Sequence, residues 1–411
     1  MESIVIVGGG HAAAQLCASL AEAGLGAGVH LVCAEGVLPY QRPPLSKAYL
    51  KNPAELLQPH RADAWYAQAG ITVHRSDPAL AIDRAARTVR LRSGTELAYG
   101  HLVLATGARA RRPVGWPADL ANVAVLRNAA DADACRRLLD GATSLTVLGG
   151  GFIGLEVAAT ARALGLAVQV VEVAPRLLGR SVSVELAEHV LAVHRAAGIE
   201  VVLDARLGEV EHDGQRLIAL GIDGRRQPVE RLLLGIGAEP EVGLGQAAGL
   251  VVDNGIVVDA AMRSSDPAIL AIGDVAGFPV SPPWAPAGTR LRLESVQNAN
   301  DQARTAALTL QGRSPVYAAL PWFWSEQGAM RLQMAGLMPA PGTAGATRHR
   351  RPGASAASFS ILHYVGERLV CAESVNAPMD HMAARKLLET GRHPAPALAC
   401  DPAVALKSLL A

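Results

Sequence analysis

The sequence contains one glycine-rich pattern twice: Gly-Gly-Gly-His-Ala-Ala at residues 8–13, the first fingerprint, and Gly-Gly-Gly-Phe-Ile-Gly at residues 149–154, the second fingerprint. Each copy follows a short apolar run, at residues 4–7 and 145–148. A strand, a tight glycine turn and a helix in this order hold a dinucleotide, because the glycines let the backbone approach the pyrophosphate and the helix N-terminus attracts its charge. We therefore expect two nucleotide cofactors in one chain, and electron transfer.

Each fingerprint is followed by a second predicted strand with an acidic residue at or near its end, Glu35 in the first copy and Glu172 in the second. A carboxylate at this place accepts hydrogen bonds from the ribose hydroxyls and repels a 2′-phosphate. The second copy is therefore expected to favour NADH over NADPH, although Arg176 and Arg180 follow it and would soften that preference. The alternative for either copy is a tight turn without a ligand, since glycine serves any turn that needs a positive φ.

The composition narrows the class of protein further. A chain of 411 residues has room for two or three domains, and its net charge of +1 does not point to nucleic acid or an acidic membrane. Apolar runs are shorter than the roughly 18–20 residues that a membrane span needs. The chain enters its first predicted strand almost at once, so we expect no targeting segment and a cytoplasmic location.

The cysteines are too scattered to form a redox pair or a metal site. They lie without a Cys-x-x-Cys pair or zinc-type spacing, and we expect reduced structural thiols and no metal. Reductases that relay electrons through a dithiol carry two closely spaced cysteines, so electrons must leave this protein by another route. The five residues are Cys17, Cys33, Cys135, Cys371 and Cys400.

Alternating strand and helix patterns fill the first two thirds of the chain, which predicts an α/β fold with parallel sheets. Residues 71–104 are rich in strand signals, with a hairpin expected around residues 92–95. The apolar runs at residues 102–104 and 232–234 both end near glycines, and this similarity suggests that the second nucleotide domain is inserted into the first.

The sequence pattern changes near residue 317, and this change predicts a separate C-terminal α+β domain. Strands are expected around residues 331–336, 358–363 and 369–374, followed by two helices. The predicted organisation is a discontinuous first nucleotide domain, a second one within it and the C-terminal domain. Their bounds are residues 1–109 with 239–318, residues 110–238, and residues 319–411.

Five segments make the chain resemble a known family. Together they are similar to the flavin-dependent pyridine nucleotide-disulfide reductase superfamily, which has a glutathione-reductase-like fold with two Rossmann-like domains. Within it, the chain resembles the ferredoxin reductases of bacterial oxygenase systems, of the biphenyl dioxygenase and putidaredoxin types, which are relatives of apoptosis-inducing factor. The resemblance covers essentially the whole chain. The segments are residues 39–47, 105–107, 149–156, 271–275 and 321–327.

The resemblance implies tightly bound FAD at the first fingerprint. Glu35 would contact the adenosine ribose; relatives often have an acid at the position of Ala34, so Glu35 must serve alone. Asp274 would bind the ribityl hydroxyls, with an ordinary Gly-Asp turn as the alternative. Arg42 and Lys47 flank two prolines that fix the backbone, and the alternative for them is a solvated loop. The implied FAD residues are Gly8, Gly10, Ala12, Glu35, Arg42, Lys47, Ala79, Thr106, Gly107, Arg127, Asp274, Val296 and Trp324.

The resemblance also implies NADH at the second fingerprint and two catalytic residues. Lys47 would lie beside the isoalloxazine, and Glu156 would reach toward the nicotinamide and toward Lys47. An ordinary exposed helical glutamate is the alternative for Glu156. The implied NAD residues are Gly149, Gly151, Ile153, Gly154, Glu156, Glu172, Arg180 and Gly237.

The function implied is that of an NADH:ferredoxin oxidoreductase. Hydride would pass from NADH to N5 of FAD, and single electrons would pass to a small acidic [2Fe-2S] ferredoxin, Rieske-type or adrenodoxin-type, that serves a Rieske dioxygenase or a cytochrome P450. Alternatives are a rubredoxin reductase, an NADH oxidase or a redox sensor similar to apoptosis-inducing factor. A basic docking face is expected, with solvated charge as the other reading of each candidate. The candidates are Arg348, Arg350 and Arg351, or Arg109, Arg111 and Arg112.

Overall fold

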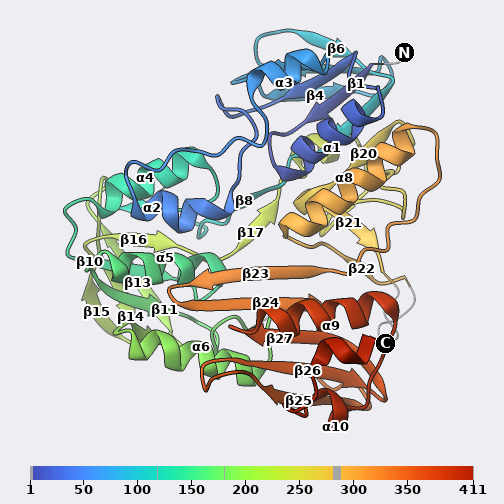
Figure 1. Cartoon of the computed structure of the whole chain (residues 1–411). Helices are drawn as coiled ribbons and strands as arrows, with labels where there is room; N and C mark the ends of the chain where they lie inside the picture. The colour runs from blue at the N-terminus through green and yellow to red at the C-terminus, as the bar shows by residue number, and fades with distance from the viewer. Residues whose placement is uncertain (1–2, 118, 180, 281–287, 411) are drawn as a thin grey trace. The chain divides into compact units, whose positions relative to one another are not determined.

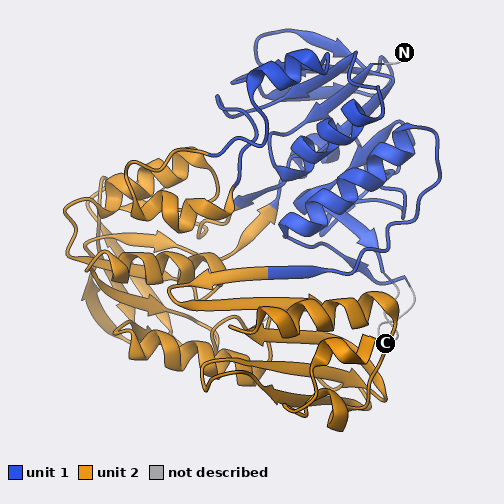
Figure 2. Ribbon diagram, in the orientation of Figure 1, with its two compact units in different colours: residues 1–41, 58–109, 240–323 blue, residues 42–57, 110–239, 324–411 orange. Residues whose placement is uncertain are grey.

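The computed structural model describes residues 3–117, 119–179, 181–280 and 288–410, and the chain divides into two compact units. Figure 2 shows the two units in different colours. The units are made of discontinuous segments, and the chain passes between them within strands β8 (Ala108–Ala110), β17 (Ala238–Pro240) and β23 (Trp322–Gln327). Unit 1 comprises Met1–Gln41, Gln58–Arg109 and Pro240–Phe323, and unit 2 comprises Arg42–Leu57, Ala110–Glu239 and Trp324–Ala411.

Unit 1 is built on a parallel five-stranded sheet (Figure 1). Its strand residues at 4–7, 102–104 and 269–271 are apolar and buried, as expected for strands covered on both faces. Helices α1 (His11–Glu22) and α8 (Val296–Leu310) pack together and bury Leu16, Leu20 and Ala303 in the core of this unit. The strand order is β20 (Ile269–Ala271), β7 (His101–Leu104), β1 (Ile4–Val7), β2 (Val29–Val32) and β3 (Thr72–His74).

Smaller elements complete unit 1. The predicted hairpin is confirmed: β5 (Thr88–Leu91) pairs with β6 (Glu96–Ala98) in an antiparallel sheet that also contains β4 (Ala79–Asp83). A second small sheet is formed within the last segment of unit 1, residues 240–323. It contains β18 (Val252–Asp253), β19 (Gly255–Val257), β21 (Ala276–Pro279) and β22 (Arg290–Leu291), and the short helices of the unit are α3 (Asp63–Gln68) and α7 (Gly243–Ala247).

Unit 2 contains a second parallel five-stranded sheet of the same kind. Helix α4 (Ala129–Leu139) begins with a capping box, in which the Asn128 side chain accepts the backbone N–H of Asp131 while the Asp131 carboxylate accepts that of Asn128. The strand order is β12 (Glu200–Val202), β11 (Ala167–Val171), β10 (Ser144–Leu148), β16 (Leu232–Leu234) and β9 (Val123–Ala124).

Several further elements of unit 2 precede, separate or follow the strands of this sheet along the chain. Helix α5 (Phe152–Ala163) follows the second fingerprint, and α6 (Val184–Ala196) begins at Ser183, whose side chain accepts the N–H of Leu186. The remaining elements are a short helical turn at Pro43–Ser46, α2 (Ala48–Lys51), and an antiparallel sheet of β13 (Leu207–His212), β14 (Leu217–Ile222) and β15 (Arg225–Pro228).

The last part of unit 2 is an antiparallel sheet with helices after it, as predicted. Two strands were not predicted. β23 was interpreted only as an aromatic segment, and β25 (Ala346–Pro352) only as a basic one. The strand order is β23, β24 (Met330–Gly336), β27 (Arg368–Val375), β26 (Phe359–Val365) and β25, and the helices are α9 (Pro378–Thr390) and α10 (Pro396–Ala399).

The α/β fold with parallel, Rossmann-like sheets is confirmed, and the three-domain division stays a prediction. Among the residues that the structure describes, no helix combines the length and the apolar character needed to cross a membrane.

Candidate cofactor sites

The first fingerprint forms the turn between β1 and α1, and its first glycine cannot be replaced without strain. Gly8 has a φ of +132°, and a Cβ atom there would lie 2.1 Å from the backbone oxygen of Ala105. Ala105 follows β7, the parallel neighbour of β1. Glycine is therefore required because the neighbouring strand end leaves no room.

Gly10 shows the opposite situation. It is the N-cap of α1, and no heavy atom of the described residues lies within 4 Å of the place where its Cβ would be. The first turn of α1 contains no acidic residue, so its N-terminal dipole is not already neutralised. Open space in front of a free helix N-terminus is what a pyrophosphate requires. The buried Ala12 and Ala13 keep this helix close to the sheet.

The acid of the first copy is held by a neighbouring tyrosine. Glu35 follows β2, and its Oε2 accepts a hydrogen bond of 2.7 Å from the Tyr40 hydroxyl. Farther along unit 1, Thr106 donates from Oγ1 to the backbone oxygen of Glu241 at 2.7 Å, and Gly107 has a φ of +72°. These contacts fix the turn that follows β7.

The other predicted FAD residues of unit 1 lie at the ends of its elements. Asp274 is in a short turn of 3₁₀ helix after β20, and the N–H of Gly273 before it donates to Gln302 Oε1 at 2.7 Å. Val296 is the first residue of α8, directly after its N-cap Ser295. Ala79 begins β4 and is half-buried.

The predicted FAD residues of unit 2 include a pair that the structure brings together. Arg42 donates from Nη1 to the backbone oxygen of Arg127 at 2.9 Å, and the N–H of Arg127 donates to Asp131 Oδ2 at 2.9 Å. Trp324 lies in β23 and is half-buried. The Arg42 side chain thus contacts the backbone of Arg127, 85 residues away in the sequence, just before α4.

The second fingerprint repeats the geometry of the first. Gly149 has a φ of +107°, and a Cβ there would lie 2.4 Å from the backbone oxygen of Gly235, which follows β16. Gly154 packs as closely, because its Cβ would lie 2.4 Å from the oxygen of Gly149. Gly151 is the N-cap of α5, and Ile153 on the first turn of that helix is 45% exposed. Gly237 has a φ of +103°.

Glu172 is built into the second turn. Its Oε2 accepts the N–H of Gly150 at 2.6 Å, and its Oε1 accepts the N–H of Ala174 at 2.7 Å. The carboxylate is therefore oriented at the edge of the fingerprint. Arg176 donates to the backbone oxygens of Gly179 and Val182, which orders the following loop, and Arg180 lies outside the described residues.

Lys47 and Glu156 form a largely buried ion pair. Lys47 Nζ lies 2.6 Å from Glu156 Oε2, and the lysine and glutamate side chains are 20% and 4% exposed. Ser46 donates from Oγ to the same Oε2 at 2.5 Å, while its backbone oxygen accepts a hydrogen bond from Thr160 Oγ1. Glu156 is thus not an ordinary exposed helical glutamate.

Sequence reasoning missed two hydroxyl groups at this pair. Ser46 binds Oε2, and Ser325 on β23 donates to the other oxygen of Glu156, Oε1, at 2.7 Å. Both serines lie in the segments, residues 39–47 and 321–327, on which the family resemblance rests. Their position in these two segments was the only sequence signal that could have identified them as site residues.

In one of the two basic docking candidates Arg350 and Arg351 make structural contacts, while Arg348 is exposed. Arg351 is 5% exposed, forms an ion pair with Asp380 and donates to three backbone oxygens that follow α9, so it is not available to a partner. Arg350 pairs with Glu185 and lies over the Phe359 ring at 3.8 Å. In the other candidate, Arg109 pairs with Glu241, whereas Arg111 and Arg112 are exposed.

The cysteines are buried or half-buried free thiols. Burial raises the pKa of Cys33 to about 12, with a further contribution from the nearby Glu35, and burial raises the pKa of Cys135 to about 12. Burial also raises the pKa of Cys17 and Cys371. Thiols that stay protonated at neutral pH are poor nucleophiles, so burial argues against a role of these four cysteines in a dithiol relay.

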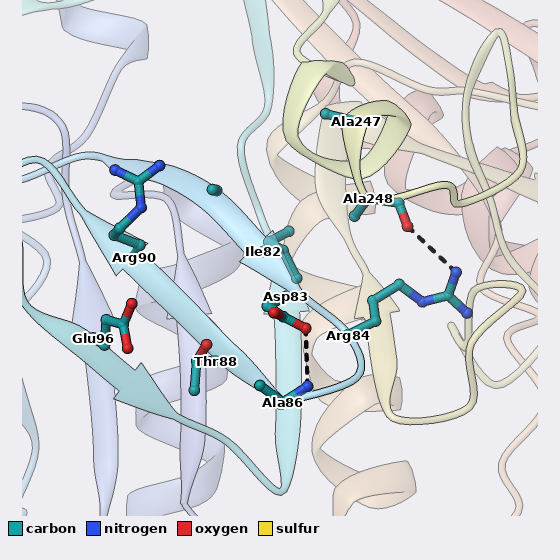
Figure 3. A pocket seen from close by; sticks show the side chains of 10 residues that line it. Ile82, Asp83, Arg84, Ala86, Thr88, Arg90, Glu96, Ala247 and Ala248 are labelled. Carbon is teal, nitrogen blue, oxygen red and sulfur yellow. Dashed lines mark hydrogen bonds between the residues drawn. The ribbon is translucent and has the colours of Figure 1, made fainter.

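Figure 3 shows a surface hollow of unit 1; the predicted site residue Ala79 lies on one of its strands, β4, but does not line it. It is lined by the antiparallel β4–β6 sheet and by Ala247 and Ala248. Arg84 at its rim donates to the Ala248 oxygen and pairs with Asp266, so its charge is already neutralised. We assign this hollow no cofactor.

The chain belongs to the pyridine nucleotide-disulphide oxidoreductase family, which matches residues 2–303. A second family, described as a reductase C-terminal domain, matches residues 322–410. Family membership implies a flavin and a nicotinamide cofactor, in agreement with the two fingerprints.

Similar proteins cover the whole chain. Rhodocoxin reductase of Rhodococcus erythropolis is 41% identical over 100% of this chain and 94% of its own length. The ferredoxin–NAD(+) reductase component of an anthranilate 1,2-dioxygenase system from Burkholderia cepacia is 40% identical over 100% and 99%. The solved ferredoxin reductase for the CYP199A2 system of Rhodopseudomonas palustris covers 100% of both chains with a TM-score of 0.93 and 40% identity.

Proposed function

We propose that this protein is an NADH:ferredoxin oxidoreductase with tightly bound FAD. The observation that supports this most strongly is the pair of glycine turns, each with a first glycine of positive φ that presses against a neighbouring strand end, and each followed by a helix with a glycine N-cap. The relatives named above are reductases, and two of the names state that ferredoxin is the partner.

The residues of the first fingerprint fit the pyrophosphate of FAD. The space in front of Gly10 is open, the α1 N-terminus offers positive charge, and Gly8 and Ala12 keep the turn tight. Glu35 would hold the ribose and Asp274 the ribityl chain. Ala79, Thr106, Gly107, Val296, Arg42, Lys47, Arg127 and Trp324 complete the proposed FAD set.

The residues of the second fingerprint fit NADH. Gly149, Gly151, Ile153 and Gly154 form the turn before α5, with Gly237 on the neighbouring strand end. Glu172 is the proposed ribose ligand, because two backbone N–H groups already orient it. A ribose 2′-phosphate would meet this carboxylate at close range, so NADPH is disfavoured. Arg180 remains a proposed contact, and the proposed NAD-binding domain is residues 110–238.

The reaction needs one group that takes a hydride and releases single electrons, and FAD supplies that chemistry when it is bound. The chain supplies orientation and charge. The Lys47 ammonium and the Glu156 carboxylate form the polar pair that positions the nicotinamide, and burial strengthens their mutual attraction.

We propose that electrons leave through a partner, because the sequence has no closely spaced cysteine pair and burial raises the pKa of Cys33 and Cys135. The proposed partner is a small acidic [2Fe-2S] ferredoxin of Rieske or adrenodoxin type that serves a terminal oxygenase. We propose Arg111 and Arg112 as the docking face, because both side chains are exposed, whereas in the other candidate Arg351 is buried and Arg350, although exposed, pairs with Glu185. A cytoplasmic location, without binding to nucleic acid or membranes, stays a prediction.

NADH-dependent reduction of cytochrome c tests this function, with and without a panel of acidic [2Fe-2S] ferredoxins. We expect strong stimulation by at least one ferredoxin of the panel. Rubredoxin is included as a competing acceptor. Stimulation by rubredoxin alone would identify a rubredoxin reductase, and rapid oxygen consumption without stimulation would identify an NADH oxidase.

Charge reversal tests the docking face. The double variant R111E/R112E should raise the KM for the ferredoxin by roughly tenfold, because rim charges steer association. NADH-to-ferricyanide activity should not change, since ferricyanide needs no docking face. Equal ferredoxin KM values in variant and parent would exclude this face.

A further inference from the structure

Both oxygens of the Glu156 carboxylate are bound, and by different parts of unit 2. Ser46 and Lys47, which directly precede α2, contact Oε2, whereas Ser325 on β23 contacts Oε1. Rotation about the terminal bond of a glutamate is only weakly restricted. Contacts to Oε2 alone leave the carboxylate plane free to swing about that oxygen. The Ser325 hydroxyl supplies the second point that fixes the plane.

Ser325 is in turn held by a buried chain of side chains. Gln327, two residues along β23, donates from Nε2 to Ser325 Oγ at 3.2 Å. Its Oε1 lies 2.8 Å from His194 Nε2 on α6. Ser325, Gln327 and His194 are 0%, 2% and 2% exposed.

The direction of the hydrogen bonds in this chain is fixed at both ends. The carboxylate accepts from Ser325, so the serine hydroxyl hydrogen is committed and its oxygen accepts from the amide of Gln327. Burial lowers the pKa of His194, so the ring is neutral near pH 7 and its Nε2–H donates to Gln327 Oε1. Each of these buried polar groups thus has a hydrogen-bond partner in a compatible donor or acceptor role.

We propose that Ser325, supported by Gln327 and His194, is a positioning residue for hydride transfer that holds the Glu156 carboxylate in the plane required by the Lys47 pair. This inference rests on the proposed function only in assigning Lys47 and Glu156 to the nicotinamide. It explains why a strand of the C-terminal sheet ends its aromatic run with a buried serine.

A matched control exists in the same sheet. Ser360 on β26 is also 0% exposed, and its hydroxyl pairs with that of Ser374 at 2.9 Å. Ser360→Ala therefore removes a buried hydroxyl at a comparable cost without touching Glu156. A purely structural role for Ser325 predicts that Ser325→Ala and Ser360→Ala behave alike.

The experiment is anaerobic rapid mixing of the FAD-containing full-length protein with NADH. In Ser325→Ala the limiting rate of flavin reduction should fall by roughly tenfold or more, because a small misplacement of a positioning group has large effects on rate. The dissociation constant for NADH should change little. The long-wavelength charge-transfer absorbance of the reduced protein with NAD⁺, which reports stacking rather than turnover, should weaken. Ser325→Thr should restore part of both.

Three results would overturn the proposal: a limiting rate and charge-transfer band in Ser325→Ala equal to those of Ser360→Ala, a loss confined to thermal stability, or no rescue by a folded Ser325→Thr. Should Ser325→Ala not fold, Gln327→Met keeps the hydroxyl and removes its support, and an unchanged rate there counts against the proposal. Because no ferredoxin is used, absence of a ferredoxin partner leaves this test intact.

Discussion

The two fingerprints share their first glycine and differ at their last position. Gly8 and Gly149 both have a positive φ and press against the backbone oxygen that follows a neighbouring parallel strand, that of Ala105 or Gly235. At the last position, however, the first copy has Ala13, fully buried, where the second has Gly154. Sterics therefore require a glycine at the first position of both turns, whereas the last position has room for a methyl group in the first copy and not in the second.

The acids of the two copies also differ. Glu35 accepts from a side chain, the Tyr40 hydroxyl, whereas Glu172 accepts two backbone N–H groups, one of them within its fingerprint. The second turn is thus held in shape by the residue that we propose as its ribose ligand, Glu172. Such preorganisation suits a cofactor that must bind and leave repeatedly, because less order has to be created at each encounter.

The largest effect is expected from Gly8→Ala. The added Cβ would meet the Ala105 oxygen at 2.1 Å, and both the clash and the φ of +132° oppose it. We expect a loss of roughly 3–5 kcal/mol in the free energy of unfolding and loss of flavin. Urea unfolding followed by circular dichroism and flavin absorbance measures both. Wild-type stability in Gly8→Ala would show that the strand end can move away.

Substitution at the last fingerprint position, Ala13 in the first copy and Gly154 in the second, should lower the free energy of unfolding by unequal amounts. Gly154→Ala brings a methyl group to 2.4 Å from the Gly149 oxygen and 3.2 Å from Val147 Cγ1, which should cost about 1–3 kcal/mol. Ala13→Gly creates no clash and should cost about 1 kcal/mol through helix propensity. Thermal unfolding of both variants compares them. Equal losses of stability in the two variants would contradict the view that only α5 packs so closely that its last fingerprint position must be glycine.

The acid of the second copy is tested by Glu172→Gln. The amide retains one acceptor and places a donor against the other backbone N–H, so we expect the KM for NADH to rise roughly tenfold. Discrimination against NADPH should fall. Glu200→Gln on β12, an exposed glutamate paired with Gln169, is the control and should leave both KM values unchanged. An unaltered NADH-to-NADPH preference in Glu172→Gln would remove this residue from cofactor selection.

The smallest effect is expected at Cys33, which lies behind Gly9 of the first copy. Burial holds the thiol pKa at about 12, so the reactive thiolate is scarce at pH 8 and grows only as the pH approaches that value. Iodoacetamide at pH 8 should therefore leave flavin content and NADH oxidation unchanged. Rapid alkylation of Cys33 with loss of activity would indicate a redox thiol.

The sequence was sufficient to predict the features that depend on neighbouring residues. Apolar runs such as residues 4–7 and 232–234 form buried parallel strands, because strand burial and glycine turns depend on residues that are neighbours in the sequence. β25 was missed because its exposed arginines, Arg348 and Arg350, resemble a charged surface loop. In a strand, alternate residues face opposite sides, and the buried Arg351 shows that the sheet uses both.

Contacts between distant segments could not be predicted in this way. Glu156 and Ser325 are 169 residues apart, and Lys47 and Glu156 are 109 apart. The Lys47 contact was expected only through the family resemblance. Nothing in the local pattern around Ser325 distinguishes a serine that binds Glu156 from one that pairs within its sheet, such as Ser360.

The central claim is that the first fingerprint retains FAD while the second admits NADH only transiently. Cofactor stoichiometry after exhaustive gel filtration tests it in wild type, Gly10→Ala and Gly151→Ala, each first incubated with FAD and NAD⁺. We predict one FAD and no NAD⁺ per wild-type chain, an FAD-free but folded Gly10→Ala, and a Gly151→Ala that keeps its FAD. Loss of FAD from Gly151→Ala with retention in Gly10→Ala would contradict the account.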